Sequence, residues 1–378
     1  ILENEAMIAR REKMMKIRSN KAKGFTLIEL MIGSAVMLVV ILGALSLYNR
    51  SNRIAVDQQQ LAELQHDVRS AMFFCSRDVR MAGSGLAYEF AQHFIEGTDN
   101  ESQGATVTPD RLKIIGNMEN PLNLGISEYQ GSAAEITIND YGFEQYPYPD
   151  EFYTQVGLVL VLPNPESGCL VGEIRQITHV THASTGTNEG FNFSPGLAPG
   201  IDPPGGLSGT CPDANDYDGG TIAFVNVKEY WLDITGNYPG LTAGLDGYIG
   251  NGEGGILYLT ENGLHYPLAR NVEDLQFEYN GDLDNDDSGI LDGFSPWQDT
   301  WTEDQLARID QVRIWIIGRT EKRYVSVSGT PPSDLYVYRR PQVSNSSLGD
   351  NDMHRRFMLD STVTIRNMSM DLYNFGER

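Results

Sequence analysis

The residues with the most suggestive chemistry form an aspartate-rich turn, Asp284 to Asp292. An EF-hand calcium loop takes side-chain oxygens at its first, third, fifth and ninth positions, a glycine at its sixth and a backbone carbonyl at its seventh. Counted from the first aspartate, the ligands are Asp284, Asp286, Ser288, Ile290 (through its carbonyl) and Asp292, with Gly289 at the sixth position. The pattern predicts a structural Ca²⁺ that fixes this turn.

The loop departs from the EF-hand at its twelfth position, where Ser295 replaces the bidentate glutamate. A closing ligand must therefore come from elsewhere, and the nearby candidates are Asp282, Asp299 and Glu303. The alternative is a solvated acidic turn, because Asp, Asn, Ser and Gly also favour turns.

No catalytic constellation is evident. The chain has no Gly-x-Ser-x-Gly elbow, Walker loop, Cys-x-x-Cys pair or His-Glu-x-x-His helix. The glycines at 250–255 have a dinucleotide-type spacing, but they precede a predicted strand where that fingerprint opens a helix. We therefore expect no enzymatic activity. A membrane-tethered enzyme is an alternative for which the sequence nominates no residues.

Three cysteines occur, Cys75, Cys169 and Cys211. Cys169 and Cys211 flank a segment rich in Gly, Pro, Ser and Asn, whereas Cys75 lies on the apolar stripe of a predicted helix. We therefore expect a Cys169–Cys211 disulfide, which in an oxidising compartment would contribute up to about 4 kcal/mol by loop closure. We expect Cys75 to be a buried, unreactive thiol. Three unpaired thiols are the alternative.

A single carboxylate, Glu29, stands near the start of a long apolar segment. From Leu30 to Tyr48 there is no charged residue and no proline. With the residues before Glu29, this segment is long enough to cross a hydrocarbon core of about 30 Å at about 1.5 Å per residue. No small-residue cleavage site follows it, so we expect it to remain as an anchor. A carboxylate at this depth is costly unless a cation pairs with it.

Charge predicts how the chain is oriented. Residues 1–24 carry seven Lys or Arg against three Glu, a net charge of +4, and the whole chain carries -23, which leaves -27 for the remainder. The basic leader should stay cytoplasmic, which places the acidic remainder across the membrane. Such an acidic domain repels phosphate backbones, so we expect no nucleic-acid partner.

The apolar segment continues as an amphipathic helix. Its apolar stripe has helical spacing: Ile54, Leu61, Leu64, Val68, Met72, Cys75, Val79 and Ala82. Gly83-Ser84-Gly85 should end the helix, which would then be roughly 55 residues long. We therefore predict an assembly or membrane helix over 25–48 and an amphipathic continuation over 49–85.

The rest of the chain, 86–378, reads as strands and loops. The predicted strands are Arg111 to Ile115, Ala134 to Asn139, Gly157 to Leu162, Glu173 to Thr181, Thr221 to Ile234, Ile256 to Thr260, Asp274 to Tyr279, Gln311 to Gly318 and Ser361 to Arg366. No amphipathic helix separates them, which favours an α+β fold with one mainly antiparallel sheet packed on the helix. Segments 183–218 and 280–301 are predicted loop insertions. Trp297 and Trp301, within the second, are expected in core or loop packing, with an exposed contact to another subunit as the alternative.

The stretch Gly24-Phe25-Thr26-Leu27-Ile28-Glu29 closely resembles the processing site of type IV prepilins and of the related pseudopilins of type II secretion. In that family a membrane-embedded peptidase cuts after the glycine and methylates the new amino terminus, which here would be Phe25. The resemblance implies that residues 1–24 are a cleaved leader and that Glu29 pairs with the terminal amine of a neighbouring subunit.

Later stretches resemble PilW-type minor pilins: 77–83, 265–279, 312–320 and 362–367. This resemblance implies a minor pilin processed by prepilin peptidase and assembled with the major pilin, other minor pilins and a tip adhesin. It would act at or near the filament tip, or in assembly initiation, in adhesion and twitching motility. It would lie in the inner membrane with a periplasmic domain before assembly and in the extracellular pilus afterwards. The alternatives are a J-type pseudopilin and a membrane-anchored, calcium-dependent adhesion domain.

Overall fold

The chain is described from a computed structural model. The described residues are 24–86, 94–99, 109–118, 123–130, 135–138, 158–169, 172–182, 189–193, 211, 214–234, 255–261, 263–284, 291–320, 338, 341–345 and 354–365. The chain divides into two compact units, residues 1–58 and 59–378. Each unit is considered by itself below.

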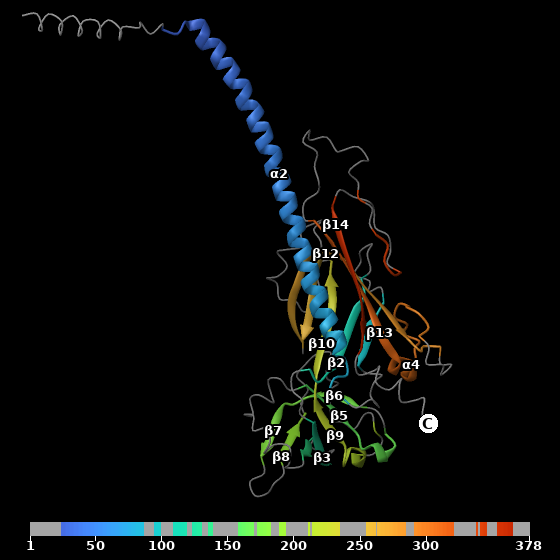
Figure 1. The fold of residues 1–378 in the computed structure, drawn as a ribbon. Coiled ribbons are helices and arrows are strands. Elements are labelled where there is room, and N and C mark those ends of the chain that lie inside the picture. The colour runs from blue at the N-terminus through green and yellow to red at the C-terminus, as the bar shows by residue number, and fades with distance from the viewer. Residues whose placement is uncertain are drawn as a thin grey trace, which may run out of the picture. The chain divides into compact units, whose positions relative to one another are not determined.

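A single helix, α2 (Leu27–Arg80), runs for 54 residues, in agreement with the predicted length (Figure 1). In the first unit its side chains are almost all exposed. Among the described residues, α2 is the one helix long and apolar enough to cross a membrane. In the second unit the predicted stripe is buried from Leu64 to Ala82, whereas Ile54, which starts the stripe within the first unit, is half exposed.

The first sheet has seven antiparallel strands in the order β1-β2-β10-β11-β12-β13-β14. Their bounds are β1 Ile95–Thr98, β2 Arg111–Gly116, β10 Asn226–Asp233, β11 Gly255–Glu261, β12 Leu264–Gly281, β13 Ile309–Arg319 and β14 Arg356–Thr364. A short helix, α4 (Glu303–Ala307), precedes β13, and its capping box joins Thr302 and Gln305.

The second half of α2 packs on this sheet. Leu64, Val68 and Val79 share one core with Ile314 and Ile316 of β13. Each such side chain stabilises the fold by about 1.5 to 3 kcal/mol on burial. The helix approaches β13 so closely that a Cβ at Gly318 would lie 2.6 Å from Leu64 Cδ1, so a larger residue at this position would force the Leu64 side chain to move.

The second sheet also has seven antiparallel strands, in the order β6-β5-β9-β3-β4-β8-β7. Their bounds are β3 Asn123–Gln130, β4 Glu135–Ile138, β5 Leu158–Leu162, β6 Glu173–Gln176, β7 His179–His182, β8 Glu189–Asn192 and β9 Thr221–Phe224. Two short 3-10 helices accompany them, η2 (Pro165–Ser167) and η3 (Ala214–Tyr217).

The α+β class, the long helix and its packing on an antiparallel sheet are confirmed, and the strands are divided between two sheets. The predicted strand Thr221 to Ile234 is two strands, because the chain passes from the second sheet to the first at Val225. The predicted strand Glu173 to Thr181 is likewise two, β6 and β7. Three strands were missed, β1, β3 and β8, and β8 lies inside the segment predicted as the coil 183–218. Strand β12 begins ten residues earlier than predicted and extends into the predicted insertion 280–301.

Candidate functional site

The amino-terminal site is a reciprocal capping box at the start of α2. The Glu29 carboxylate accepts hydrogen bonds from the Thr26 backbone amide and the Thr26 hydroxyl, both at 2.9 Å through Oε2. The Glu29 amide donates in turn to Thr26 Oγ1 at 3.3 Å. This is the arrangement that Thr-x-x-Glu favours at a helix start, because it satisfies amides that have no partner within the helix. Thr26 therefore belongs to the site, although our sequence prediction named only Gly24, Phe25 and Glu29.

The residues around the predicted cleavage point are open to solvent. The Phe25 side chain is 88% exposed, and nothing lies within 4 Å of a Cβ built on Gly24. Within the described part of the chain, no basic side chain forms an ion pair with Glu29. The chain thus presents an accessible segment followed by a carboxylate that its own helix end holds in place. The leader before Gly24 lies outside the described residues.

The predicted calcium loop is described only at its ends. Asp286, Ser288 and Ile290 lie outside the described residues, whereas Asp284 and Asp292 lie within them. One carboxylate oxygen from each of Asp282, Asp284 and Asp292 lies within 4.8 Å of the other two. Oδ2 of Asp292 also accepts the backbone amides of Leu283 and Asp284 at 2.6 Å. The chain thus gathers three carboxylates at this turn, a donor set that suits Ca²⁺.

The suggested closing ligands fall in different places. Asp282 joins the acidic group and also approaches Arg308 at 3.4 Å. Asp299 instead accepts the Trp297 indole N–H at 3.1 Å. Ser295, at the twelfth position, forms an antiparallel bridge with Tyr279. Of the candidates, only Asp282 lies with the two described loop residues.

The tryptophans beside this turn pack against the sheet. Trp297 is 9% exposed, and its ring lies 5.2 Å from Tyr279 and 5.3 Å from Trp301 between centroids. A Cβ on Gly97 would lie 2.6 Å from the Trp297 ring, so β1 also packs tightly on it. This contact favours the core packing that we expected over an exposed contact for another subunit.

A buried ionic network ties the end of α2 to β10. The Asp78 side chain is 2% exposed and accepts the Tyr230 hydroxyl at 2.6 Å. Lys228 Nζ lies 3.4 Å from Asp78 and 3.3 Å from Glu261, and Arg77 bonds the other Asp78 oxygen at 2.8 Å. Burial, then the nearby Cys75 and Asp78, raise the pKa of Tyr230, so its phenol stays protonated and donates. Sequence analysis did not find this network, whose members Arg77 and Glu261 lie 184 residues apart.

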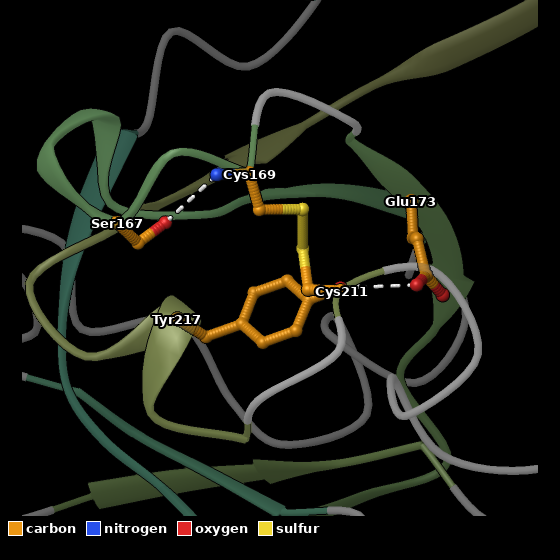
Figure 2. Close-up of a disulfide and its surroundings, with 5 residues drawn as sticks. All are labelled: Ser167, Cys169, Glu173, Cys211 and Tyr217. Carbon is orange, nitrogen blue, oxygen red and sulfur yellow. Dashed lines mark hydrogen bonds between the residues drawn. A yellow bond between two sulfur atoms is a disulfide. The ribbon is translucent and has the colours of Figure 1, made fainter.

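Cys169 and Cys211 form a disulfide across a sequence separation of 42, and Cys75 is buried and free. Burial, and to a smaller extent Asp78, raise the pKa of the Cys75 thiol, which keeps it protonated and unreactive. Figure 2 shows the disulfide beside Tyr217, whose hydroxyl donates to Glu173 at 3.0 Å. Glu173 also forms a buried ion pair with Arg175.

Comparison with known proteins identifies a known motif in the amino-terminal segment. Residues 19–45 match the model of the prokaryotic N-terminal methylation motif. The pilin-like protein PilA3 of Thermus thermophilus is 25% identical over 122 residues, which are 32% of this chain and 49% of that protein. The chain therefore matches about half the length of this curated relative.

A solved structure, the type IV-like pilin TTHA1219 from Thermus thermophilus, is 12% identical and aligns over 56% of this chain and 84% of that one. Its TM-score of 0.19 is too low to support an argument. Two features make this chain similar to type IV pilins: the N-terminal methylation motif, and a long N-terminal apolar helix with antiparallel sheets in an α+β fold.

Proposed function

We propose that this chain is a minor pilin of a type IV pilus, with a structural rather than catalytic role. The observation that carries the proposal is the methylation motif at the start of a helix whose apolar segment has one carboxylate, Glu29, and this carboxylate is held at the helix end. Prepilin peptidase would cut after Gly24, and the methylated Phe25 amine would become the terminus. The PilW-like stretches support the minor-pilin assignment, together with assembly alongside the major pilin, other minor pilins and a tip adhesin.

The capping box suggests how Glu29 tolerates the bilayer before assembly. An unpaired carboxylate in hydrocarbon is costly, but here two donors from Thr26 satisfy one of its oxygens. The other oxygen then remains for the terminal amine of a neighbouring subunit. Such a buried ion pair specifies the register of one helix on the next more than it adds raw stability.

Replacing Glu29 with alanine is expected to abolish incorporation into filaments while leaving cleavage after Gly24 intact, because the residue acts after processing. Thr26→Val should lower incorporation only in part, since it removes one donor and keeps the carboxylate. Cleavage is measured by N-terminal sequencing, and incorporation by immunoblot of sheared pili. Glu63→Gln, which changes an exposed carboxylate on the same helix, is the matched control. Normal incorporation of Glu29→Ala would rule out the pilin mechanism and favour the anchored adhesion domain.

A type II secretion pseudopilin remains the second candidate, because the processing motif is common to both. A photo-crosslinker at Ile54, which is 48% exposed, separates them. Capture of the major pilin supports the pilus, and capture of secretion pseudopilins supports the alternative. N-terminal sequencing that shows an uncut Gly24–Phe25 bond would reject both.

We also propose that the acidic turn binds a structural Ca²⁺ through Asp284 and Asp292, with Asp282 close by and Asp286, Ser288 and Ile290 as the remaining ligands. The proximity of the three described carboxylates supports this, since a divalent cation would relieve their mutual repulsion. If Kd is about 1 mM, as in extracellular modules, 10 mM Ca²⁺ should stabilise the chain by about 1.4 kcal/mol. Thermal unfolding in Ca²⁺, Mg²⁺ and EDTA measures this. Asp284→Asn should lose the increment and the control Asp304→Asn should keep it; an increment retained by Asp284→Asn rejects the site.

A further inference from the structure

A pocket of about 550 Å³ lies in the second unit, where the chain leaves β12 and returns to β13. Its lining comes from three places: Leu283 and Asp284 beyond the end of β12, residues between 292 and 301, and Gln305 of α4. Small-molecule sites in proteins have volumes of about 300 to 1,000 Å³. The pocket is therefore large enough to hold a small ligand.

Hydrogen bonds hold the walls of this pocket in place. Ser295 pairs with Tyr279 through two backbone hydrogen bonds, at 2.7 and 2.9 Å, which tie the segment 292–301 to β12. The Gln305 side chain completes the capping box with Thr302 and also donates to the Leu283 carbonyl. Because these contacts exist without a ligand, binding would require little further ordering of the protein.

Trp301 forms a fixed aromatic wall. Its ring lies 5.3 Å from that of Trp297 and 6.0 Å from that of Tyr279 between centroids, in edge-to-face contacts. Trp297 and Tyr279 are both buried, whereas Trp301 is only partly buried and lines the pocket. The core thus supports Trp301, which offers a flat apolar surface to a ligand.

The indole N–H of Trp301 differs from those of the other three tryptophans. Each of the others donates to an acceptor in the chain, at 2.7 to 3.3 Å: Trp231 to Thr260, Trp297 to Asp299 and Trp315 to Glu278. Within the described part of the chain, the Trp301 N–H makes no such bond. Tryptophan N–H groups usually find a partner when they leave bulk water. The pocket therefore carries a donor that a ligand oxygen could accept.

The rest of the lining is mostly neutral and polar. Hydroxyl and amide groups, which both donate and accept hydrogen bonds, come from Ser295, Gln298, Thr300 and Gln305. Among the described residues that line the pocket there is no lysine or arginine, so a phosphate or carboxylate would find no cation. The two carboxylates, Asp284 and Asp292, belong to the acidic turn of the proposed Ca²⁺ site. This lining suits an uncharged ligand that has several hydroxyl groups and one apolar face.

We propose that the pocket binds a neutral hexose. A pyranose ring presents a face of C–H groups, which would pack on Trp301, and hydroxyl groups at its edge, which would bond Gln298, Thr300 and the Trp301 N–H. The proposal adds a ligand class that the pilin assignment does not supply, and it does not depend on that assignment. Because the pocket shares Asp284 and Asp292 with the proposed Ca²⁺ site, its test alters neither residue.

The probes are D-galactose, D-glucose, D-mannose and N-acetyl-D-glucosamine, each tested by saturation-transfer NMR with the full chain. The detergent must lack a sugar headgroup, which would compete, and Ca²⁺ is held constant. Titration of the strongest binder gives Kd.

Two variants alter the pocket. Trp301→Phe keeps an aromatic ring but removes the N–H, and Gln298→Ala removes an exposed amide. Trp315→Phe and Gln59→Ala make the same changes outside the pocket. Each pocket variant should raise Kd about fivefold, the effect of losing one hydrogen bond, and each control should change it less than about twofold. Thermal unfolding checks each fold, and the exposed Gln298 keeps the test valid if Trp301→Phe is unstable.

Absence of saturation transfer to all four sugars would overturn the proposal. An unchanged Kd in both pocket variants would overturn it as well, because the sugar would then bind elsewhere. Glucosamine, which carries an ammonium in place of the acetamide, tests selection by charge: tighter binding than N-acetyl-D-glucosamine would show that the pocket selects a cation, contrary to the proposal. These failures are distinct from failure of the pilin mechanism, which would appear as normal incorporation of Glu29→Ala.

Discussion

Replacing Asp78 with asparagine is expected to destabilise the second unit by about 3 to 5 kcal/mol. The substitution removes one partner of a buried charge network and leaves Lys228, whose side chain is 5% exposed, with Glu261 as its remaining partner at 3.3 Å. The new amide group would also face the Tyr230 hydroxyl or the Arg77 guanidinium, which are both donors. Denaturant unfolding of the detergent-solubilised chain, followed by circular dichroism, measures the loss.

Two further variants separate a buried network from ordinary surface pairing. Glu96→Gln removes an ion pair in which Lys113 Nζ lies 2.8 Å from the Glu96 carboxylate. Because the Glu96 side chain is 61% exposed, this substitution should lower the free energy of unfolding by less than about 1 kcal/mol. Asp78→Leu combined with Lys228→Met removes both opposite charges and should recover much of the loss. An Asp78→Asn effect no larger than that of Glu96→Gln would show that the network contributes little.

Local patterns in the sequence predicted the parts of the fold whose cause is local. The stripe from Leu64 to Ala82 has the helical period, and burial of that face follows from it. The capping box at the start of the helix could also have been predicted, because Thr26 and Glu29 have its spacing.

The parts that were missed depend on contacts between distant segments. The run Leu158 to Leu162 reads as a buried strand, but nothing in it shows that its two faces serve different cores. The division of the strands between two sheets follows from which strands pair, and the break between β6 and β7 at Ile177 and Thr178 is not marked by a glycine or proline. Strand β8, Glu189–Asn192, was missed because it is short and lies among glycine, proline and serine. The network around Asp78 was missed because its residues come from α2, β10 and β11, which are far apart in the sequence.

Replacing both Cys169 and Cys211 with alanine removes the disulfide and is expected to lower the free energy of unfolding by about 4 kcal/mol. The loop that the disulfide closes spans a sequence separation of 42, so its stabilisation should lie between the values of about 3 and about 4.7 kcal/mol for a shorter and a longer loop. The segment between the two cysteines contains β6, β7 and β8, so the loss should concentrate in the second sheet. Amide hydrogen exchange should accelerate in those strands and stay slow in β13, which lies in the first sheet.

Reduction of the unaltered chain with dithiothreitol is the internal control for that prediction. It should lower stability to the level of the double-alanine variant, and the variant itself should not respond, because Cys75 has no disulfide partner. This covalent link closes the segment that contains β6, β7 and β8, and Cys211 contributes to the hydrophobic core of the second sheet. Faster exchange across β13 as well would contradict unfolding confined to the second sheet, since the loss would then pass through β5 to the core that it shares with α2. Unchanged stability on reduction would show that the core and the strand pairing of the second sheet suffice without the disulfide.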